Sequence, residues 1–187
     1  MNYRSLFATA KSWVILTGCC ALAGMARGQS GPAAPAQVAA TKQLAFANSK
    51  ALFQSANLDL AEATLVAANQ RPPGTAQWNA ESGFSLTRMA FELHGSGNGP
   101  LAVAVAQRAL RQLASATQKY TTADNPAKVA NVYEGIGFID EQLLGDFAGA
   151  EQNYAAAVRL SPGTGQAARL LARLRQTATE EAKRNGK

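Results

Sequence analysis

The chain has 187 residues, of which 47% are apolar and only 7% aromatic. This length suits one domain with a hydrophobic core, and the abundance of alanine favours helices over sheets, which are richer in β-branched and aromatic residues. The formal net charge is +6. Part of that charge lies in the first 28 residues, so the remainder is only mildly basic and argues against nucleic acid as a partner.

Residues 1–28 have the pattern of an export signal. Two basic residues, Arg4 and Lys11, precede the apolar run SWVILTGCCALAGMA, which is short for a membrane span. Small residues at positions 26 and 28 predict cleavage before Gln29. Cleavage there would leave 15 of the 18 basic side chains against 12 acidic ones. We therefore expect an exported protein of the bacterial periplasm, with a flexible linker at 29–37 and a domain at 38–185.

Two other interpretations of the N-terminus stay open. LTGC at 16–19 resembles the bacterial lipoprotein box, in which Cys19 would be acylated and would tether the protein to a membrane. The residues that follow, CCALAGMA, are more apolar than the usual lipoprotein tether. An uncleaved N-terminal anchor is the third interpretation. Cys19 and Cys20 are the only cysteines, so a chain cleaved before Gln29 would have neither a disulfide nor a zinc thiolate site.

From residue 36 onward the apolar spacing is helical, and no segment alternates as a strand does. RPPG, GSGNGP, TADNP, LGD and SPG interrupt this pattern. We predict seven helices between these breaks, at 36–55, 58–70, 75–94, 100–119, 126–143, 147–160 and 165–184. Asn125 followed by Pro126 is typical of a helix start. The connections are short, which predicts antiparallel neighbours.

An internal repeat underlies the alanine-rich pattern. ANLDLAEATLVAANQRPPG at 56–74 aligns without a gap with GDFAGAEQNYAAAVRLSPG at 145–163. The aligned pairs include Leu58 with Phe147, Ala61 with Ala150, Leu65 with Tyr154, and Ala68 with Ala157. A weaker third copy follows the same offsets at Val103, Ala106, Leu110 and Leu113. Repeated helical units of this kind indicate a stacked architecture.

Residues 133–162 resemble a tetratricopeptide repeat. The matching positions are Tyr133, Ile136, Gly137, Gly145, Phe147, Ala150, Tyr154, Ala157 and Pro162. The match needs one extra residue before Gly145, and Asp140 stands where the family's first helix has its next aromatic residue. A degenerate copy begins at Trp78, with Ser82 in place of the family's glycine.

The resemblance implies an all-α fold, a right-handed array of three antiparallel helix pairs closed by a C-terminal capping helix. Small residues at the helix crossings, Gly137, Ala150 and Ala157, would allow close approach, while Tyr133 and Tyr154 would fill the gaps between layers. The apolar face of the capping helix would consist of Ala167, Leu170, Leu171, Leu174 and Ala178. An ordinary alanine-rich bundle is the alternative architecture.

No pattern in the sequence predicts catalysis. His94 is the only histidine, and no neighbouring motif supplies a nucleophile and an orienting carboxylate. GSGNG at 95–99 joins two helices, without the preceding strand of a dinucleotide loop or the Lys-Ser/Thr of a P-loop. It is predicted to be a connector. We expect no enzyme activity, no cofactor and no metal.

The resemblance also implies that a partner binds along the concave surface formed by the first helix of each pair. The residues selected by that pattern are Lys42, Ser49, Asn79, Asn131, Glu134 and Phe138. We expect the protein to act as an interaction or assembly scaffold for an unidentified protein or peptide of the cell envelope. In the alternative, Arg169, Arg173 and Arg175 of the C-terminal helix would bind an anionic membrane or envelope polymer, and this binding would weaken with salt.

Overall fold

The computed structural model describes residues 35–69, 71–121, 123–163 and 166–185, and the chain divides into the units 1–38 and 39–187. The predicted export signal at 1–28, with Cys19, lies outside the described residues. So does most of the predicted linker at 29–37. Its last three residues are helical, because the first described helix begins at Pro35.

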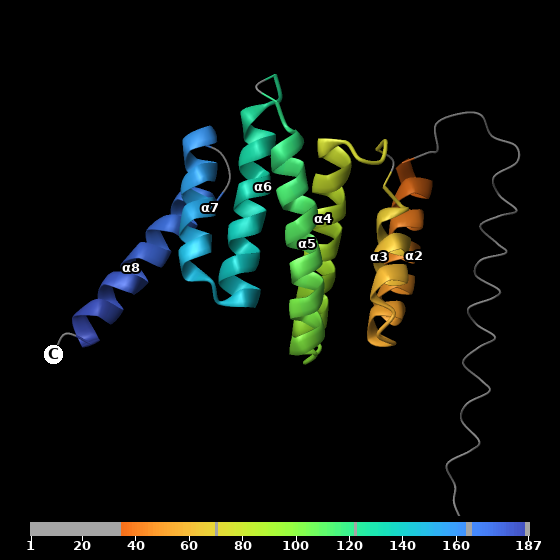
Figure 1. Cartoon of the computed structure of the whole chain (residues 1–187), viewed down its shortest axis with the longest axis horizontal. Coiled ribbons are helices and arrows are strands. Elements are labelled where there is room, and N and C mark those ends of the chain that lie inside the picture. The colour runs from red at the N-terminus through yellow and green to blue at the C-terminus, as the bar shows by residue number, and fades with distance from the viewer. Residues whose placement is uncertain (1–34, 70, 122, 164–165, 186–187) are drawn as a thin grey trace, which may run out of the picture. The chain divides into compact units, whose positions relative to one another are not determined.

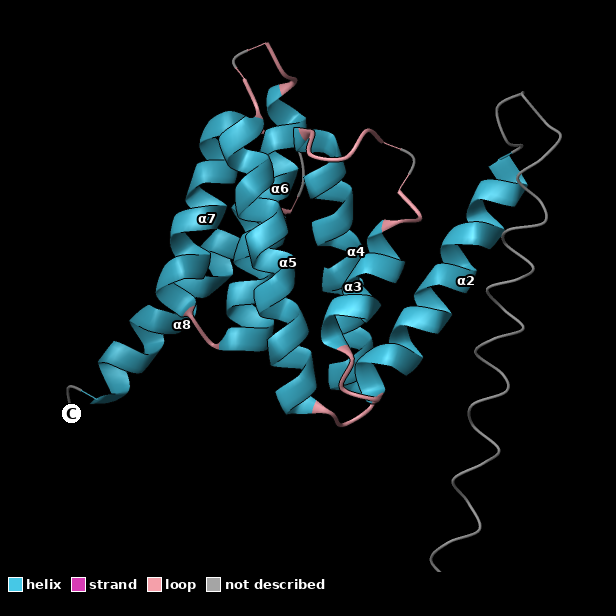
Figure 2. Ribbon diagram, turned by 45° about the vertical axis from the view of Figure 1, so that its right-hand side comes forward, coloured by secondary structure: helices cyan, strands magenta, loops and turns pink. Residues whose placement is uncertain are grey.

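The described part of the chain is all-α and contains no strand (Figures 1 and 2). Its elements are α2 (Pro35–Gln54), α3 (Leu58–Val66), α4 (Ala76–Gly95), α5 (Gly99–Lys119), α6 (Pro126–Ile139), the π-helical turn η1 (Asp140–Leu144), α7 (Phe147–Leu160) and α8 (Ala167–Asn185). All seven predicted helices are present. The largest error is at the end of α3, which stops at Val66 rather than at residue 70. Asn69 beyond it donates its side-chain amide to Ser82 Oγ of α4 at 2.7 Å.

Polar side chains fix several helix starts. Asn125 Oδ1 accepts from the N–H of Ala127 at 2.9 Å, and Pro126 occupies the first helical position of α6, as predicted. Asp146 Oδ1 likewise accepts from the N–H of Gly149 at the start of α7, at 2.9 Å. These caps satisfy backbone donors that have no partner within the helix.

The same kind of connection joins α2 to α3, α4 to α5, and η1 to α7. In each, a residue with positive φ directly precedes an Asn or Asp that stands before the next helix. The positive-φ residues are Ala56 (62°), Gly97 (82°) and Gly145 (67°), and Asn57, Asn98 and Asp146 follow them. Three helix pairs therefore share one turn, and in two of them glycine supplies the left-handed conformation that it adopts most easily.

A hydrogen bond across each connection locates an extra residue in the third pair. The N–H of Asn57 donates to the carbonyl of Leu52, and that of Asn98 to Leu93, both five residues back. The N–H of Asp146 donates instead to the carbonyl of Asp140, six residues back, at 2.9 Å. The π-helical turn η1, which holds one more residue per hydrogen-bonded turn than an α-helix, accounts for the difference.

Two groups of buried side chains hold the helices of unit 39–187 together. The larger extends from Phe53 of α2 through α3, α4 and α5 to Val132 and Ile139 of α6. The smaller joins α6, α7 and α8. Ala150, Tyr154 and Ala157 are buried there, with Tyr133 packed against them, as predicted. Ile136 packs against the larger group, and Gly137 lies against the Tyr154 ring.

Two of the matching positions, Phe147 and Pro162, are exposed, and the third copy of the repeat aligns differently in the structure. Phe147, the first residue of α7, is 60% exposed. Pro162 is also exposed, in the turn after α7. The third copy of the repeat is displaced by about one helical turn. Counted from the residue before each helix, Ala61 and Ala150 correspond to Ala102, not to Ala106. A shift of four residues keeps the same helix face, so apolar spacing alone does not distinguish the two alignments.

Helix α8 covers the end of the second buried group through Ala167, Leu170, Leu171 and Leu174, all of which are buried as predicted. Ala178, predicted on the same face, is exposed. From residue 175 to 184 every side chain of α8 is exposed, so only the first half of this helix packs on the array. Among the described residues, no helix combines the length and the apolar character needed to cross a membrane.

Candidate functional site

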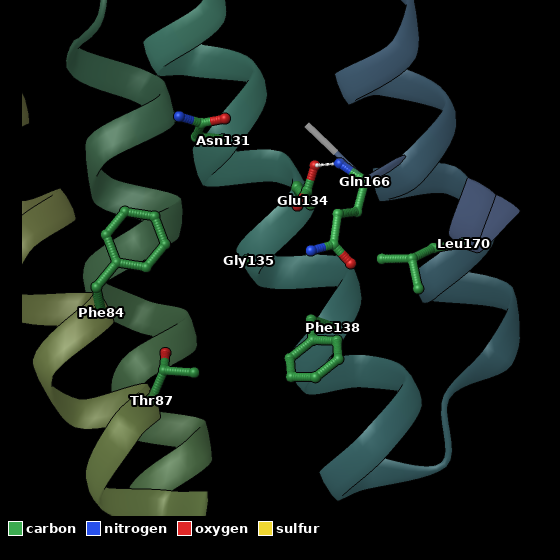
Figure 3. Close-up of a pocket in the computed structure, with 8 residues that line it drawn as sticks. All are labelled: Phe84, Thr87, Asn131, Glu134, Gly135, Phe138, Gln166 and Leu170. Atoms are coloured by element: carbon green, nitrogen blue, oxygen red, sulfur yellow. Dashed lines mark hydrogen bonds between the residues drawn. The ribbon is translucent and has the colours of Figure 1, made fainter. Parts of the chain in front are cut away.

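A groove of about 530 Å³ lies between α4, α6 and the start of α8 (Figure 3). Its walls are largely apolar, with a few polar groups. The lining residues are Phe84 and Thr87 of α4, Asn131, Glu134, Gly135 and Phe138 of α6, and Gln166 and Leu170 beside or within α8. Its size and composition are in the range of sites that accept ligands.

Two half-exposed aromatic rings form the apolar part of the groove. Phe84 is 39% exposed and Phe138 38% exposed. The Phe138 ring lies 5.1 Å, between centroids, from the ring of Phe91 on α4. Gly135 makes room for Phe84, because a Cβ at this position would be 2.7 Å from Cε1 of that ring. The two helices thus hold the rings in place while leaving part of each open to solvent.

Glu134 joins the groove to the C-terminal helix. Its Oε2 accepts a hydrogen bond from the backbone N–H of Gln166 at 2.9 Å (Figure 3). The same oxygen accepts from the backbone N–H of Ala167 at 3.0 Å. A carboxylate from another helix therefore caps the start of α8, where free N–H groups and the helix dipole favour negative charge. This bond also fixes the position of the carboxylate beside the groove.

The remaining polar groups of the groove are mainly primary amides. Asn131 is exposed on α6, and Gln166 precedes α8. Gln166 Oε1 accepts from Arg169 at 2.7 Å. A primary amide can both donate and accept, as a peptide bond does. Of the described residues that line the groove, Glu134 is the one with an ionisable side chain.

The structure brings together three of the six residues predicted to bind a partner. Asn131, Glu134 and Phe138 all line the groove. Lys42 is exposed outside it and lies 3.9 Å from a carboxylate oxygen of Glu81.

The expectation that Ser49 and Asn79 lie on the same exposed face is wrong. Ser49 is fully buried, and its hydroxyl has no hydrogen-bond partner among the residues that the structure describes. Asn79 is buried as well, and its amide donates to Ser115 Oγ of α5 at 2.9 Å. Both side chains are therefore part of the interior.

The wrong starting residue explains these errors. Equivalent positions can be counted back from the shared connections, with the extra residue of η1 allowed for. By this count, Asn131, Glu134 and Phe138 correspond in α4 to Phe84, Thr87 and Phe91. In α2 they correspond to Gln43, Phe46 and Lys50. Ser49 is thus one residue away from the equivalent position, a rotation of about 100° around the helix. Counting from Gly97-Asn98 instead of from Trp78 would have found Phe84 and Thr87.

Two cations of α8, Arg173 and Arg175, form ion pairs with carboxylates of neighbouring elements. Arg173 donates to Glu141 Oε1, and Glu141 Oε2 accepts from the hydroxyl of Tyr154 at 2.9 Å. Burial, followed by this hydrogen bond, raises the pKa of the Tyr154 phenol. Arg175 donates to Glu151 Oε1 at 2.8 Å. These contacts tie α8 to η1 and α7.

Two other sequence features that were considered for catalysis or ligand binding lie at or next to the end of α4. His94 is exposed at the end of α4. The GSGNG segment connects α4 to α5, as predicted, and Asn98 Oδ1 accepts from the N–H of Leu101 at 3.4 Å. Within the described ranges, no three His, Cys, Asp or Glu side chains gather as a metal ion would need.

No protein-family model matches the sequence, and no curated protein or solved structure matches it either. The function must therefore be inferred from the chemistry of the groove.

Proposed function

We propose that the protein is an exported helical-repeat protein, similar to tetratricopeptide repeat proteins, that binds a protein or peptide segment in the groove between α4, α6 and α8. It would act as an interaction or assembly scaffold without catalysis. The observation that carries this proposal is the pair of half-exposed rings, Phe84 and Phe138, in a concave apolar site. Aromatic side chains in such sites contribute strongly to protein–protein binding.

The repeat assignment is supported by positions that recur in all three helix pairs. Ala61, Ala102 and Ala150 each stand four residues after the capping residue, and all three are fully buried. A small side chain at one equivalent position lets neighbouring helices approach closely. The third pair has one residue more across its connection than the other two pairs, in the π-helical turn η1. An insertion there would account for the extra residue that the family match needs and would leave the helix pair intact.

Export is proposed from the N-terminal pattern alone. Mass spectrometry of the mature protein tests it. A chain that begins at or near Gln29 would support a soluble periplasmic protein, whereas an acylated Cys19 would support a membrane-tethered one. An intact N-terminus in a cytoplasmic fraction would contradict export.

The alternative, adhesion of the basic α8 to an anionic surface, has less support. Arg173 and Arg175 each already pair with a carboxylate, and Arg169 donates to Gln166. Binding to a surface would compete with these contacts. Binding of a partner in the groove should persist at moderate salt concentration, whereas adhesion of α8 to an anionic surface should weaken steeply as the salt concentration rises.

Selection from a displayed library of nonapeptides on the purified protein tests binding in the groove. We expect the selected peptides to lose about tenfold or more in affinity with Phe138→Ala. Phe147→Ala is the matched control, since Phe147 is more exposed and lies on α7 outside the groove. Equal losses with both variants, or no loss with Phe138→Ala, would contradict the proposed site. Thermal melts followed by circular dichroism verify that both variants are folded.

A further inference from the structure

The described residues that line the groove carry a charge opposite to that of the chain. The whole sequence has a net charge of +6, yet these residues include one carboxylate, Glu134, and no Lys or Arg; the guanidinium of Arg169, which is not a lining residue, donates to Gln166 Oε1. Because Oε2 of Glu134 is held by the backbone N–H groups of Gln166 and Ala167, the carboxylate remains at the groove edge. A ligand side chain of positive charge would complement it, and one of negative charge would be repelled.

The aromatic rings favour the same sign of charge. A cation placed over the face of a phenylalanine is attracted by the ring. This protein already contains such a contact, since the guanidinium carbon of Arg88 lies 4.5 Å from the centroid of the Phe46 ring. The partly open rings of Phe84 and Phe138 can pack against an apolar side chain or against the guanidinium of a ligand.

The amides add a way to hold the main chain of a ligand. Asn131 and Gln166 lie in different parts of the groove (Figure 3), and each amide can donate to a carbonyl and accept from an N–H. Amide groups bind a peptide backbone without regard to its side chains. Selectivity would then come from the rings and from Glu134.

We infer that the groove binds a peptide segment in which a large apolar side chain stands next to Lys or Arg, and that it rejects acidic segments. The apolar side chain packs against Phe84 and Leu170, while the cation reaches the Glu134 carboxylate. This inference rests on the proposed function, because it names the chemical class of ligand for that same groove.

Three labelled nonapeptides test the ligand class by fluorescence anisotropy at one fixed ionic strength. Each has a central leucine in a Gly-Ser background, flanked on both sides by arginine, glutamine or glutamate. We expect the arginine peptide to bind about tenfold more tightly than the glutamate peptide, with the glutamine peptide between them. Equal binding of the three, or tighter binding of the glutamate peptide, would overturn the inference.

Variants of the groove separate charge recognition from other effects. Glu134→Gln keeps a side-chain oxygen for the N–H groups of α8, and it should abolish most of the arginine preference while leaving the glutamine peptide unchanged. Glu181→Gln removes the same charge from an exposed site on α8 and should keep the preference. Asn131→Lys, at an exposed position, should shift the preference toward glutamate. An arginine preference that survives both groove variants overturns the inference.

The two proposals fail in distinguishable ways. If library-selected peptides bind through Phe138 but show no charge preference, the ligand class is wrong and the proposed function remains. If neither the selected nor the designed peptides lose affinity with Phe138→Ala, the groove is not the binding site and both proposals fail.

Discussion

Gly137 of α6 lies directly against Tyr154 of α7. A Cβ at Gly137 would be 2.8 Å from Cε1 of the tyrosine ring and 3.2 Å from the carbonyl oxygen of Ala150. Tyr154 is fully buried and its hydroxyl is bonded to Glu141, so the ring cannot move aside without losing other contacts.

Gly137→Ala should therefore destabilise the protein by about 1–3 kcal/mol, even though alanine is the better helix former by about 1 kcal/mol. Gly135→Ala is the matched control two residues earlier. Its added methyl meets the half-exposed ring of Phe84, which can turn toward solvent. Chemical denaturation should show a clear loss for the first variant and little or none for the second. Equal effects would mean that the α6–α7 crossing is not tightly packed.

Ala150→Leu tests the same crossing from α7. Ala150 is fully buried, and the larger side chain should overpack the interface and cost about 1–3 kcal/mol of unfolding free energy. Ala148→Leu, at an exposed position of the same helix, is the control and should be nearly neutral. A thermal melt that Ala150→Leu leaves unchanged would contradict the close approach of the two helices.

Local signals in the sequence were sufficient to predict the helices and three of the groove residues that lie on α6. Asn125-Pro126 and Gly145-Asp146 form their capping and turn contacts with residues only a few positions away. The helix starts that they predict are therefore present. Asn131, Glu134 and Phe138 share one face of a single helix and line one groove. Periodicity within a helix predicts this grouping without any knowledge of the neighbouring helices.

The rest of the groove depends on contacts between helices that are distant in sequence. Phe84 lies at the groove because Gly135, on another helix, leaves space for its ring. Gln166 lies there because Glu134 binds the backbone at the start of α8. Neither contact produces a pattern within its own segment. Ser49 is a different case, because it was selected by counting from the wrong residue and stands one position before the equivalent Lys50.

The three shared connections predict opposite effects of glycine and alanine. Ala56 adopts φ of 62°, a conformation in which a Cβ is unfavourable, so Ala56→Gly should stabilise the protein by about 1 kcal/mol. Gly145→Ala, at the equivalent position of the third pair, should destabilise it by a similar amount. Apart from Gly145 itself and its two chain neighbours, no atom of the described residues would lie within 4 Å of a Cβ at this position, so the test reports on backbone conformation. Urea denaturation should give changes of opposite sign, and changes of the same sign would contradict the shared turn.

Ser49 provides a test of its position in the interior. Its hydroxyl is buried and has no hydrogen-bond partner in the described part of the chain, so Ser49→Ala should stabilise the protein by roughly 1 kcal/mol. Ser82→Ala is the matched control, since Ser82 is equally buried but accepts from Asn69 at 2.7 Å. Removing that hydroxyl leaves a donor unpaired and should destabilise by about 1–2 kcal/mol. If both variants lose stability, Ser49 has a partner in solution.

Asp140 introduces a charge where the first two helix pairs carry leucine. The carbonyl of Asp140 accepts the hydrogen bond across its connection, as the carbonyls of Leu52 and Leu93 do in the other two pairs. Its side chain is only 7% exposed and accepts from Asn153 at 3.0 Å. Burial raises the pKa of the Asp140 carboxyl, and the nearby charge of Asp146 adds to the rise, although the hydrogen bond from Asn153 opposes it.

Because the pKa of Asp140 is higher in the folded than in the unfolded chain, its protonated form favours folding, and this contribution is lost as the pH rises through the folded-state pKa. Asp140→Asn keeps an oxygen for Asn153 but removes the charge. The variant should therefore unfold at higher urea concentration than the parent at about pH 7, and the difference should shrink as the pH falls toward the usual range of aspartate, about 4. Glu181→Gln, at an exposed site, should show neither effect. A constant difference between Asp140→Asn and the parent over this range would mean that the carboxylate is well solvated.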